Sequence, residues 1–195
     1  MKMIALGLLL AATTSLHAQS TRTVDPTASK FLWTGKKVTG EHTGGLTVKS
    51  GTVGWGANGL TAADITIDMR SITCTDMSGG GAERFVAHLH SADFFDTEKH
   101  PTAHFVTTQV EPIAGAKPGQ PNYKVTGDLT IKGITKPVTF DALAWQDGAN
   151  MRAAANLVFD RTAYDIRYRS VTFFQEIGDK AIENDVALTF DLTAK

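Results

Sequence analysis

The sequence predicts an all-β fold, a closed up-and-down barrel of eight antiparallel strands with one short helix. Apolar and polar residues alternate through most of the chain, which is typical of antiparallel strands with one face in a core and the other in water. Eight such segments follow one another, and turns that contain glycine or asparagine separate most of them. Eight mostly consecutive strands favour a barrel, and a two-sheet sandwich is the alternative.

The strands are expected to be roughly ten residues long. The segment 121–132 shows the alternation most clearly, because Val125, Leu129 and Ile131 fall on one face, with lysine, threonine and aspartate residues on the other. In chain order, the expected strands are 29–38, 43–55, 60–70, 102–112, 121–132, 137–146, 150–160 and 182–194.

Two connections are longer than hairpin turns. Residues 71–101 contain a glycine-rich loop, an expected short helix from about Ala82 to Leu89, and a turn. Residues 160–181 are aromatic and basic without a clear periodicity. Long loops in a compact domain are often lids or binding loops, so we expect both connections to lie over an open end of the barrel.

The first residues are typical of a secretory signal peptide. Lys2 supplies a positive charge, and the apolar run from Ile4 to Ala12 is too short to span a bilayer. We expect cleavage after Ala18, so that 1–18 is the signal peptide and 19–195 is a single barrel domain without a transmembrane segment. The expected location is therefore outside the cytoplasm, in a periplasm or secreted.

Charge and cysteine content narrow the range of partners. The formal net charge is −1, which argues against nucleic acid or an anionic membrane surface as the main partner. Cys74 is the single cysteine, so the chain has no internal disulfide. The oligomeric state is left open, a homodimer included.

The stretch HLHSADFFDTEKHPTAHF (88–105) contains four histidines and three carboxylates, which raises the question of a metal or acid–base site. On a helix, His88 and His90 would point away from each other. On a strand, His100 and His104 would lie ~13 Å apart, too far for one ion. We therefore expect no metal and no cofactor here. The chain also has no nucleophile elbow, phosphate loop or paired-cysteine motif, so we expect no catalytic residues.

Four blocks of the sequence resemble the YceI-like family of lipid- and polyisoprenoid-binding proteins. They are WTGKKVTGEHTGG (33–45), the histidine-rich stretch, GDLTIKGITKPVTF (127–140) and FDRTAYDIRYRS (159–170). Of the histidines, only His88 matches a position at which the family usually has histidine. The resemblance implies a lipocalin-like barrel whose lumen holds a long apolar chain, which agrees with the alternation and with the expected export.

The inward faces of two strands contain many alanines, which favours a narrow slot for such a ligand. The alternative is that these alanines complement large neighbours in a filled core. The residues expected to line the lumen are Phe105, Leu129, Ile131, Phe140, Ala142, Ala144, Ala153, Ala155, Leu157 and Phe159.

The two long connections are expected to form the mouth of the lumen. Leu89, Phe94 and Phe95 belong to the first, and Phe173 and Phe174 to the second. Polar residues that could meet a headgroup by charge or stacking are Arg161, Tyr164, Arg167, Tyr168 and His88.

These observations favour an exported, non-catalytic binding protein that carries or sequesters a polyisoprenoid, an isoprenoid quinone or a related lipid. One alternative is a metal-dependent enzyme that uses the histidine-rich loop 88–104. Another is a structural or stress-related envelope protein whose barrel binds no ligand.

Overall fold

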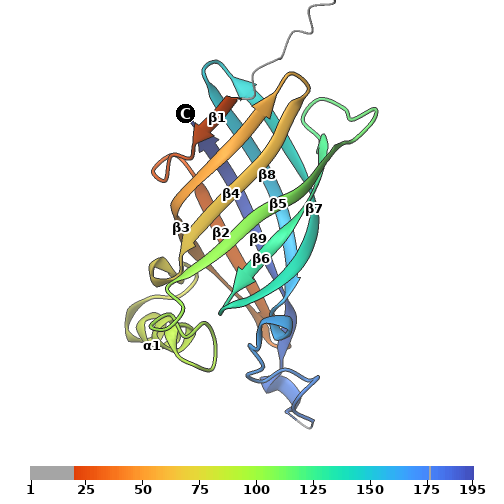
Figure 1. Ribbon diagram of the computed structural model, residues 1–195. Coiled ribbons are helices and arrows are strands. Elements are labelled where there is room, and N and C mark those ends of the chain that lie inside the picture. Colours follow the sequence, from red (N-terminus) through yellow and green to blue (C-terminus); the bar gives the residue numbers. More distant parts are fainter. Residues whose placement is uncertain (1–19, 176) are drawn as a thin grey trace, which may run out of the picture.

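The computed structural model describes residues 20–175 and 177–195, and the expected signal peptide lies outside them. Within these residues the chain forms nine strands, one α-helix and three short 3-10 helices (Figure 1). They are β1 (Ser20–Thr23), β2 (Lys30–Lys37), β3 (Gly40–Gly56), β4 (Gly59–Asp68), η1 (Met69–Ser71), α1 (Gly79–His90), β5 (Thr102–Pro112), β6 (Tyr123–Ile131), β7 (Ile134–Asp147), β8 (Asn150–Asp160), η2 (Arg161–Tyr164), η3 (Gly178–Lys180) and β9 (Ile182–Ala194).

The strands from β2 to β9 close into an eight-stranded antiparallel barrel, as the sequence predicts. Around the wall, the order is β3, β2, β9, β8, β7, β6, β5 and β4, and the pairing of β4 with β3 closes the ring. A sandwich would leave free strand edges, so this closure excludes it. The eight expected segments all form strands, and 102–112, 150–160 and 182–194 do so with the expected bounds.

The short strand β1 is not predicted by the sequence. It pairs with Thr52–Trp55 of β3, and Val24, just after it, forms a bridge with Ala194 at the end of β9. β1 therefore fills the space between β3 and β9 at the end of the barrel that β2 does not reach. Four residues are too few to show a periodicity, so the alternation of apolar and polar residues does not predict β1.

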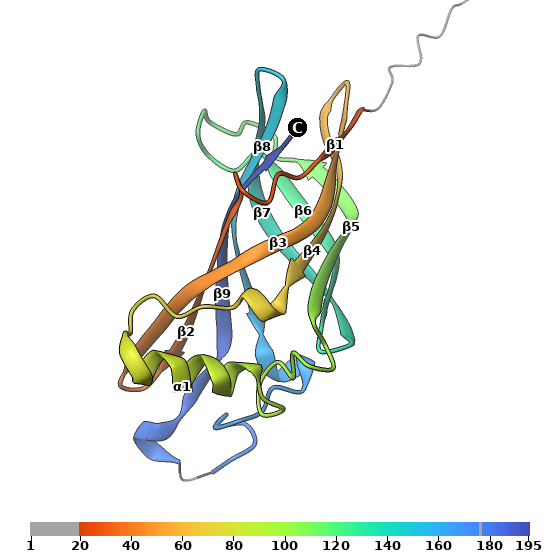
Figure 2. The same ribbon diagram turned by 90° about the vertical axis from the view of Figure 1, so that its left-hand side faces the viewer.

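The two long connections lie together at the opposite end of the barrel. α1 begins three residues before the expected position and crosses beside this end, and the segment from η2 to η3 lies below it (Figures 1 and 2). No helix in residues 20–175 and 177–195 has the length and apolar character needed to cross a bilayer.

The barrel interior is packed more tightly at the end near β1. There Tyr123, Val125, Ala142 and Ala144 form a buried cluster, against which the ring of Trp55 packs edge-on to Tyr123 at 6.4 Å between centroids. Side chains from several strands thus pack together at this end of the barrel.

Candidate functional site: an apolar cavity in the barrel

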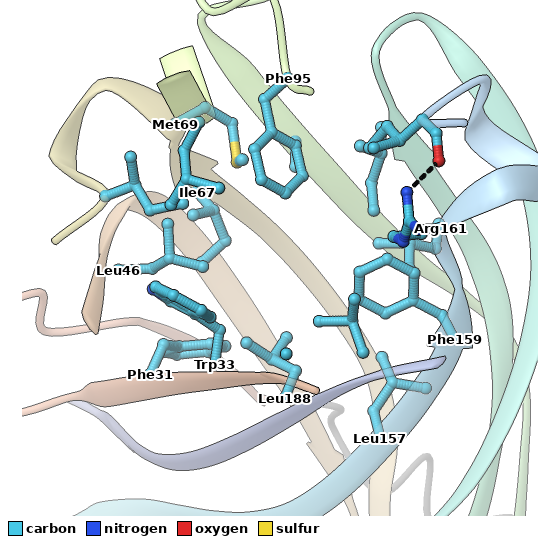
Figure 3. Close-up of a pocket in the computed structure, with 18 of the residues that line it drawn as sticks. Phe31, Trp33, Leu46, Ile67, Met69, Phe95, Leu157, Phe159, Arg161 and Leu188 are labelled. Carbon is cyan, nitrogen blue, oxygen red and sulfur yellow. Dashed lines mark hydrogen bonds between the residues drawn. The ribbon is translucent and has the colours of Figure 1, made fainter. Parts of the chain in front are cut away.

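The barrel contains a cavity of about 540 Å³, within the range of roughly 300–1,000 Å³ that is typical of small-molecule sites. Phe31 and Trp33 of β2, Ile67 of β4 and Leu157 of β8 point into it (Figure 3). Its walls are predominantly apolar, because every strand of the barrel directs alternate hydrophobic side chains inward.

The cavity opens at the end of the barrel where α1 lies. Lys36 and Lys37 at the end of β2 line it, as do Arg169, Asp179 and Lys180 from the segment 161–181. These charged residues form a rim around an apolar interior, so an apolar chain could enter while a polar end group stays in water.

Most of the residues expected in the lumen do line this cavity. The expected inward faces of β7 and β8 are correct, since each strand alternates in the sense that the apolar residues indicate. The cavity-lining residues from the expected set are Phe105, Leu129, Ile131, Phe140, Ala142, Ala153, Leu157 and Phe159.

Ala144 and Ala155 differ from this expectation. Ala144 is only 2% exposed and belongs to the buried cluster that contains Tyr123. Ala155 is half-buried, packs against that cluster and pairs with Ala142 of β7. Ala142 and Ala153 line the cavity, whereas these two residues do not. The burial of Ala144 agrees with the alternative that the sequence left open, in which an alanine complements large neighbours in a filled core.

On the α1 side of the mouth, the expected residues lie at the cavity. Leu89, Phe94 and Phe95 all line it. His88 lines it as well, with its ring packed edge-on against Phe94 at 5.0 Å and Tyr168 at 4.7 Å between centroids. This group of rings forms a largely apolar entrance.

On the other side, Phe173 and Phe174 do not line the cavity. They are 44% and 48% exposed, and the guanidinium of Arg167 lies 4.6 Å from the ring of Phe173. Nε of Arg167 is also 2.9 Å from Oδ1 of Asp165. Arg167 is thus engaged on the outside of this segment and is not directed into the mouth, contrary to the headgroup role expected for it.

Arg161 reaches the cavity wall, but its donors are already used. The guanidinium is buried and donates to the carbonyls of Ile166 at 2.7 Å, Glu183 at 2.9 Å and Ile182 at 3.1 Å. Figure 3 draws one of these hydrogen bonds as a dashed line. Burial lowers the pKa of Arg161, while the charge of Asp160 opposes this. Arg161 thus links η2 to the start of β9 and to Ile166, and these donors are not free for the headgroup contact expected from the sequence.

Tyr164 is fully buried behind the cavity and does not line it. Its ring packs edge-on against Phe159 at 5.6 Å between centroids, and burial raises its pKa to about 12. The phenol oxygen has no hydrogen-bond partner among the described residues. Of the five expected headgroup residues, Tyr168 and His88 therefore remain at the mouth with side chains that a ligand can reach.

Several cavity residues were not among those expected. The inward residues of β2 and β4, including Phe31, Trp33 and Ile67, follow the same alternation and were identifiable from it. The basic rim residues Lys36 and Lys37 are the last two residues of β2, where a register shift between Gly35 and Lys37 interrupts the pairing with β9, so the alternation does not indicate which way their side chains point.

The histidines of the stretch 88–105 belong to no converging group of three potential metal ligands among the described residues. Nε2 of His88 is 2.9 Å from Oδ2 of Asp93, Nδ1 of His90 is 2.9 Å from Oγ1 of Thr97, and Nε2 of His104 is 2.8 Å from Oδ1 of Asp64 on the neighbouring strand. These three histidines thus have separate local partners. Within residues 20–175 and 177–195, one group of three potential metal ligands does converge, and it is made by His42, Cys74 and Asp76.

Comparison with known proteins gives one family. Residues 23–194 match the model of the YceI-like domain. The protein YceI of Escherichia coli is 44% identical over 121 residues, which are 62% of this chain and 59% of the relative. A UPF0312 protein of Photorhabdus laumondii is 35% identical over 104 residues, which are 53% of this chain and 50% of the relative. The chain thus spans about half the length of the curated relatives it matches.

Solved structures give the same fold. BcnA of Burkholderia cenocepacia is 25% identical with a TM-score of 0.68, covering 88% of this chain and 99% of that one. A domain of Saccharophagus degradans, described as polyisoprenoid-binding and implicated in plant cell wall breakdown, is 18% identical with a TM-score of 0.62. That match covers 92% of this chain and 98% of the domain, and at this identity it establishes the fold alone.

Proposed function

Because the chain belongs to the YceI-like family, we propose that it is a non-catalytic binding protein whose cavity holds the chain of a polyisoprenoid, an isoprenoid quinone or a related lipid. The observation that carries the proposal is the apolar cavity of about 540 Å³, packed at one end and open at the other. A solved domain of the same fold is described as polyisoprenoid-binding, which supports this class of ligand.

Burial of the chain supplies the affinity in this proposal. Each buried CH₂ contributes about 0.8 kcal/mol, so a five-carbon isoprene unit contributes roughly 3–4 kcal/mol before costs. Three or four buried units offset the roughly 4–15 kcal/mol cost of association without a specific hydrogen bond. The ligand is therefore selected mainly by the length and width of its apolar chain, and only weakly by its headgroup.

The proposed setting is outside the cytoplasm, with carriage or sequestration of the lipid as the role. The signal-peptide pattern of residues 1–18 supports export. The observed cavity favours this role over a ligand-free barrel with a filled lumen, and the dispersed histidines give the metal-enzyme alternative of the 88–104 loop no support.

The experiment is a binding series with prenyl alcohols of two, three and four isoprene units. Trp33 lines the cavity, so its fluorescence reports on occupancy. We expect affinity to rise with each unit. Mass spectrometry of an organic extract of gently purified protein gives the natural ligand, and an isoprenoid in the extract is the expected result.

A pair of variants on one strand locates the site. Ala153→Trp fills the cavity from β8, whereas Val158→Trp adds the same bulk to an exposed position of β8, where Val158 is 52% exposed. We expect the first to abolish prenyl binding and the second to leave it unchanged. Binding that survives Ala153→Trp, or no binding of any prenyl alcohol by the unaltered chain, contradicts the proposal.

A further inference from the structure

A second cluster of polar side chains lies beside the mouth of the cavity. His42 is on β3, whereas Cys74 and Asp76 are on the segment 72–78 between η1 and α1. Nδ1 of His42 is 2.8 Å from Oδ2 of Asp76, and Sγ of Cys74 is 3.2 Å from Oδ1 of Asp76. All three potential ligand atoms lie within 4.8 Å of one another. We propose that His42, Cys74 and Asp76 bind a zinc ion at the rim of the barrel.

The three ligand types are those that zinc uses in proteins. Zinc binds thiolate sulfur at about 2.3 Å and imidazole nitrogen or carboxylate oxygen at about 2.0–2.2 Å, with tetrahedral geometry. Two ligands on such an ion lie roughly 3.4 Å apart. The Nδ1–Oδ2 and Sγ–Oδ1 separations of 2.8 and 3.2 Å lie slightly below this value, and the three ligand atoms lie within 4.8 Å of one another, so small shifts bring them around one ion.

A thiolate among the ligands favours zinc over magnesium or calcium, which prefer sites made of oxygen alone. Three protein ligands leave the fourth tetrahedral position to water or to an incoming group. The side chains of His42 and Asp76 are 23% and 30% exposed, so an ion can reach the site from solvent.

The backbone holds the segment that carries Cys74 and Asp76 against β3. The amide of Thr73 donates to the carbonyl of Gly45 at 3.0 Å, and the amide of Thr75 donates to the carbonyl of Thr43 at 2.8 Å. Cys74 thus sits between two anchored neighbours. Its sulfur is positioned before any ion binds, which reduces the entropic cost of forming the site.

The approach of this segment depends on a glycine. A Cβ atom added at Gly44 would lie 1.7 Å from the carbonyl oxygen of Thr73, which no side chain tolerates. The same carbonyl accepts a hydrogen bond from the indole N–H of Trp33 at 3.0 Å. The close contact between β3 and the segment 72–78 therefore requires glycine at position 44.

Neighbouring groups orient two of the proposed ligands. The amide of Thr43 donates to Oδ1 of Asp76 at 2.8 Å, which fixes the plane of the carboxylate and leaves Oδ2 on the side of His42. The ring of His42 packs against Phe85 of α1 at 4.6 Å between centroids. Partners of this kind hold metal ligands in position and raise the affinity of a site.

Two other histidine–aspartate pairs provide internal comparisons. His88 with Asp93 and His104 with Asp64 have nearly the same separations, 2.9 and 2.8 Å. Neither belongs to a converging group of three ligands within the described part of the chain. A histidine–aspartate pair alone is thus not sufficient for a three-ligand metal site, and the third ligand, Cys74, distinguishes the proposed site at the rim.

The test uses the full chain without an affinity tag, freed of metal by a chelator and kept reduced. Equilibrium dialysis against Zn²⁺ followed by elemental analysis is expected to give one zinc per chain. With Co²⁺ as a spectroscopic substitute, a thiolate-to-cobalt charge-transfer band is expected. Cys74→Ser removes the band, and both Cys74→Ser and Asp76→Asn lower the zinc affinity at least about tenfold, since losing even an outer partner of a metal ligand costs about 10–100-fold.

The control is His104→Gln, which removes a histidine–aspartate pair on the barrel wall and is expected to leave zinc binding unchanged. Circular dichroism and the prenyl alcohol series on each variant establish that the barrel is intact. A chain that retains no zinc overturns the proposal, as does a Cys74→Ser variant that binds zinc as well as the parent. Because the metal measurement involves no lipid, its outcome is independent of the proposed function.

Discussion

Replacement of Arg161 by methionine tests whether this buried arginine is structural. Methionine keeps an unbranched apolar side chain. It removes the three hydrogen bonds that the guanidinium donates to the carbonyls of Ile166, Ile182 and Glu183. Hydrogen bonds from a charged group contribute about 1.5–3 kcal/mol each, so the gross loss is roughly 5–9 kcal/mol. Removal of a buried cation also relieves a desolvation cost of several kcal/mol. We therefore expect the free energy of unfolding to fall by about 2–4 kcal/mol.

Urea denaturation followed by tryptophan fluorescence measures this change, and a parallel thermal melt should show a lowering of the Tm by at least about 4 °C. The matched control is Arg167→Met in the same segment, which breaks an exposed pair with Asp165 and should change stability by less than about 0.5 kcal/mol. Prenyl binding by Arg161→Met, measured well below its Tm, should equal that of the parent. A variant of unchanged stability that no longer binds prenyl alcohols would refute the structural role and restore Arg161 as a headgroup contact.

Two further changes test buried positions. Tyr164→Phe removes a buried hydroxyl that has no hydrogen-bond partner among the described residues, so it should raise the unfolding free energy by about 1 kcal/mol in urea titrations. Because burial raises the pKa of Tyr164 to about 12 from about 10, its contribution to stability is fully present below pH 10 and declines as the pH rises toward 12. The phenylalanine variant should lose less stability over that interval, and an identical alkaline decline in both proteins would count against this cause. Gly127→Ala should destabilise the barrel by about 1–3 kcal/mol, since the added Cβ would lie 2.5 Å from the ring of Phe105 and from the carbonyl oxygen of Val106. An unchanged Tm in a thermal melt would contradict this account of the packing.

The barrel could be predicted because the alternation of side chains is a local property of each strand. Residues 102–112 and 150–160 form strands with the expected bounds for this reason. Pairing between distant segments is not local, and β1 illustrates the limit, since its partner Thr52–Trp55 lies about thirty residues away in the sequence. The resemblance to a known family agreed with the closed barrel and added the class of ligand, which the alternation alone left open.

The site could be predicted only in part, because the depth of a cavity depends on side chains from several strands. Ala142 and Ala144 have the same parity and the same size and belong to the same buried cluster, yet Ala142 lines the cavity and Ala144 does not. Side chains of other strands, Tyr123 and Trp55 among them, pack in this region, and the alternation within one strand does not reveal them. The group of His42, Cys74 and Asp76 escapes detection because its members are distant in the sequence, with 34 positions between His42 and its partner Asp76.

The open end of the barrel has to hold its loops in place without filling the entrance. Apolar packing across the mouth would hold them, but it would also occupy the space that a ligand needs. Polar contacts at the margins solve this conflict. Arg161 binds carbonyls of its own segment and of β9, and the indole N–H of Trp33 binds the carbonyl of Thr73. Both side chains also line the cavity, so the groups that fasten the loops form part of its wall, and the entrance is largely formed before a ligand arrives.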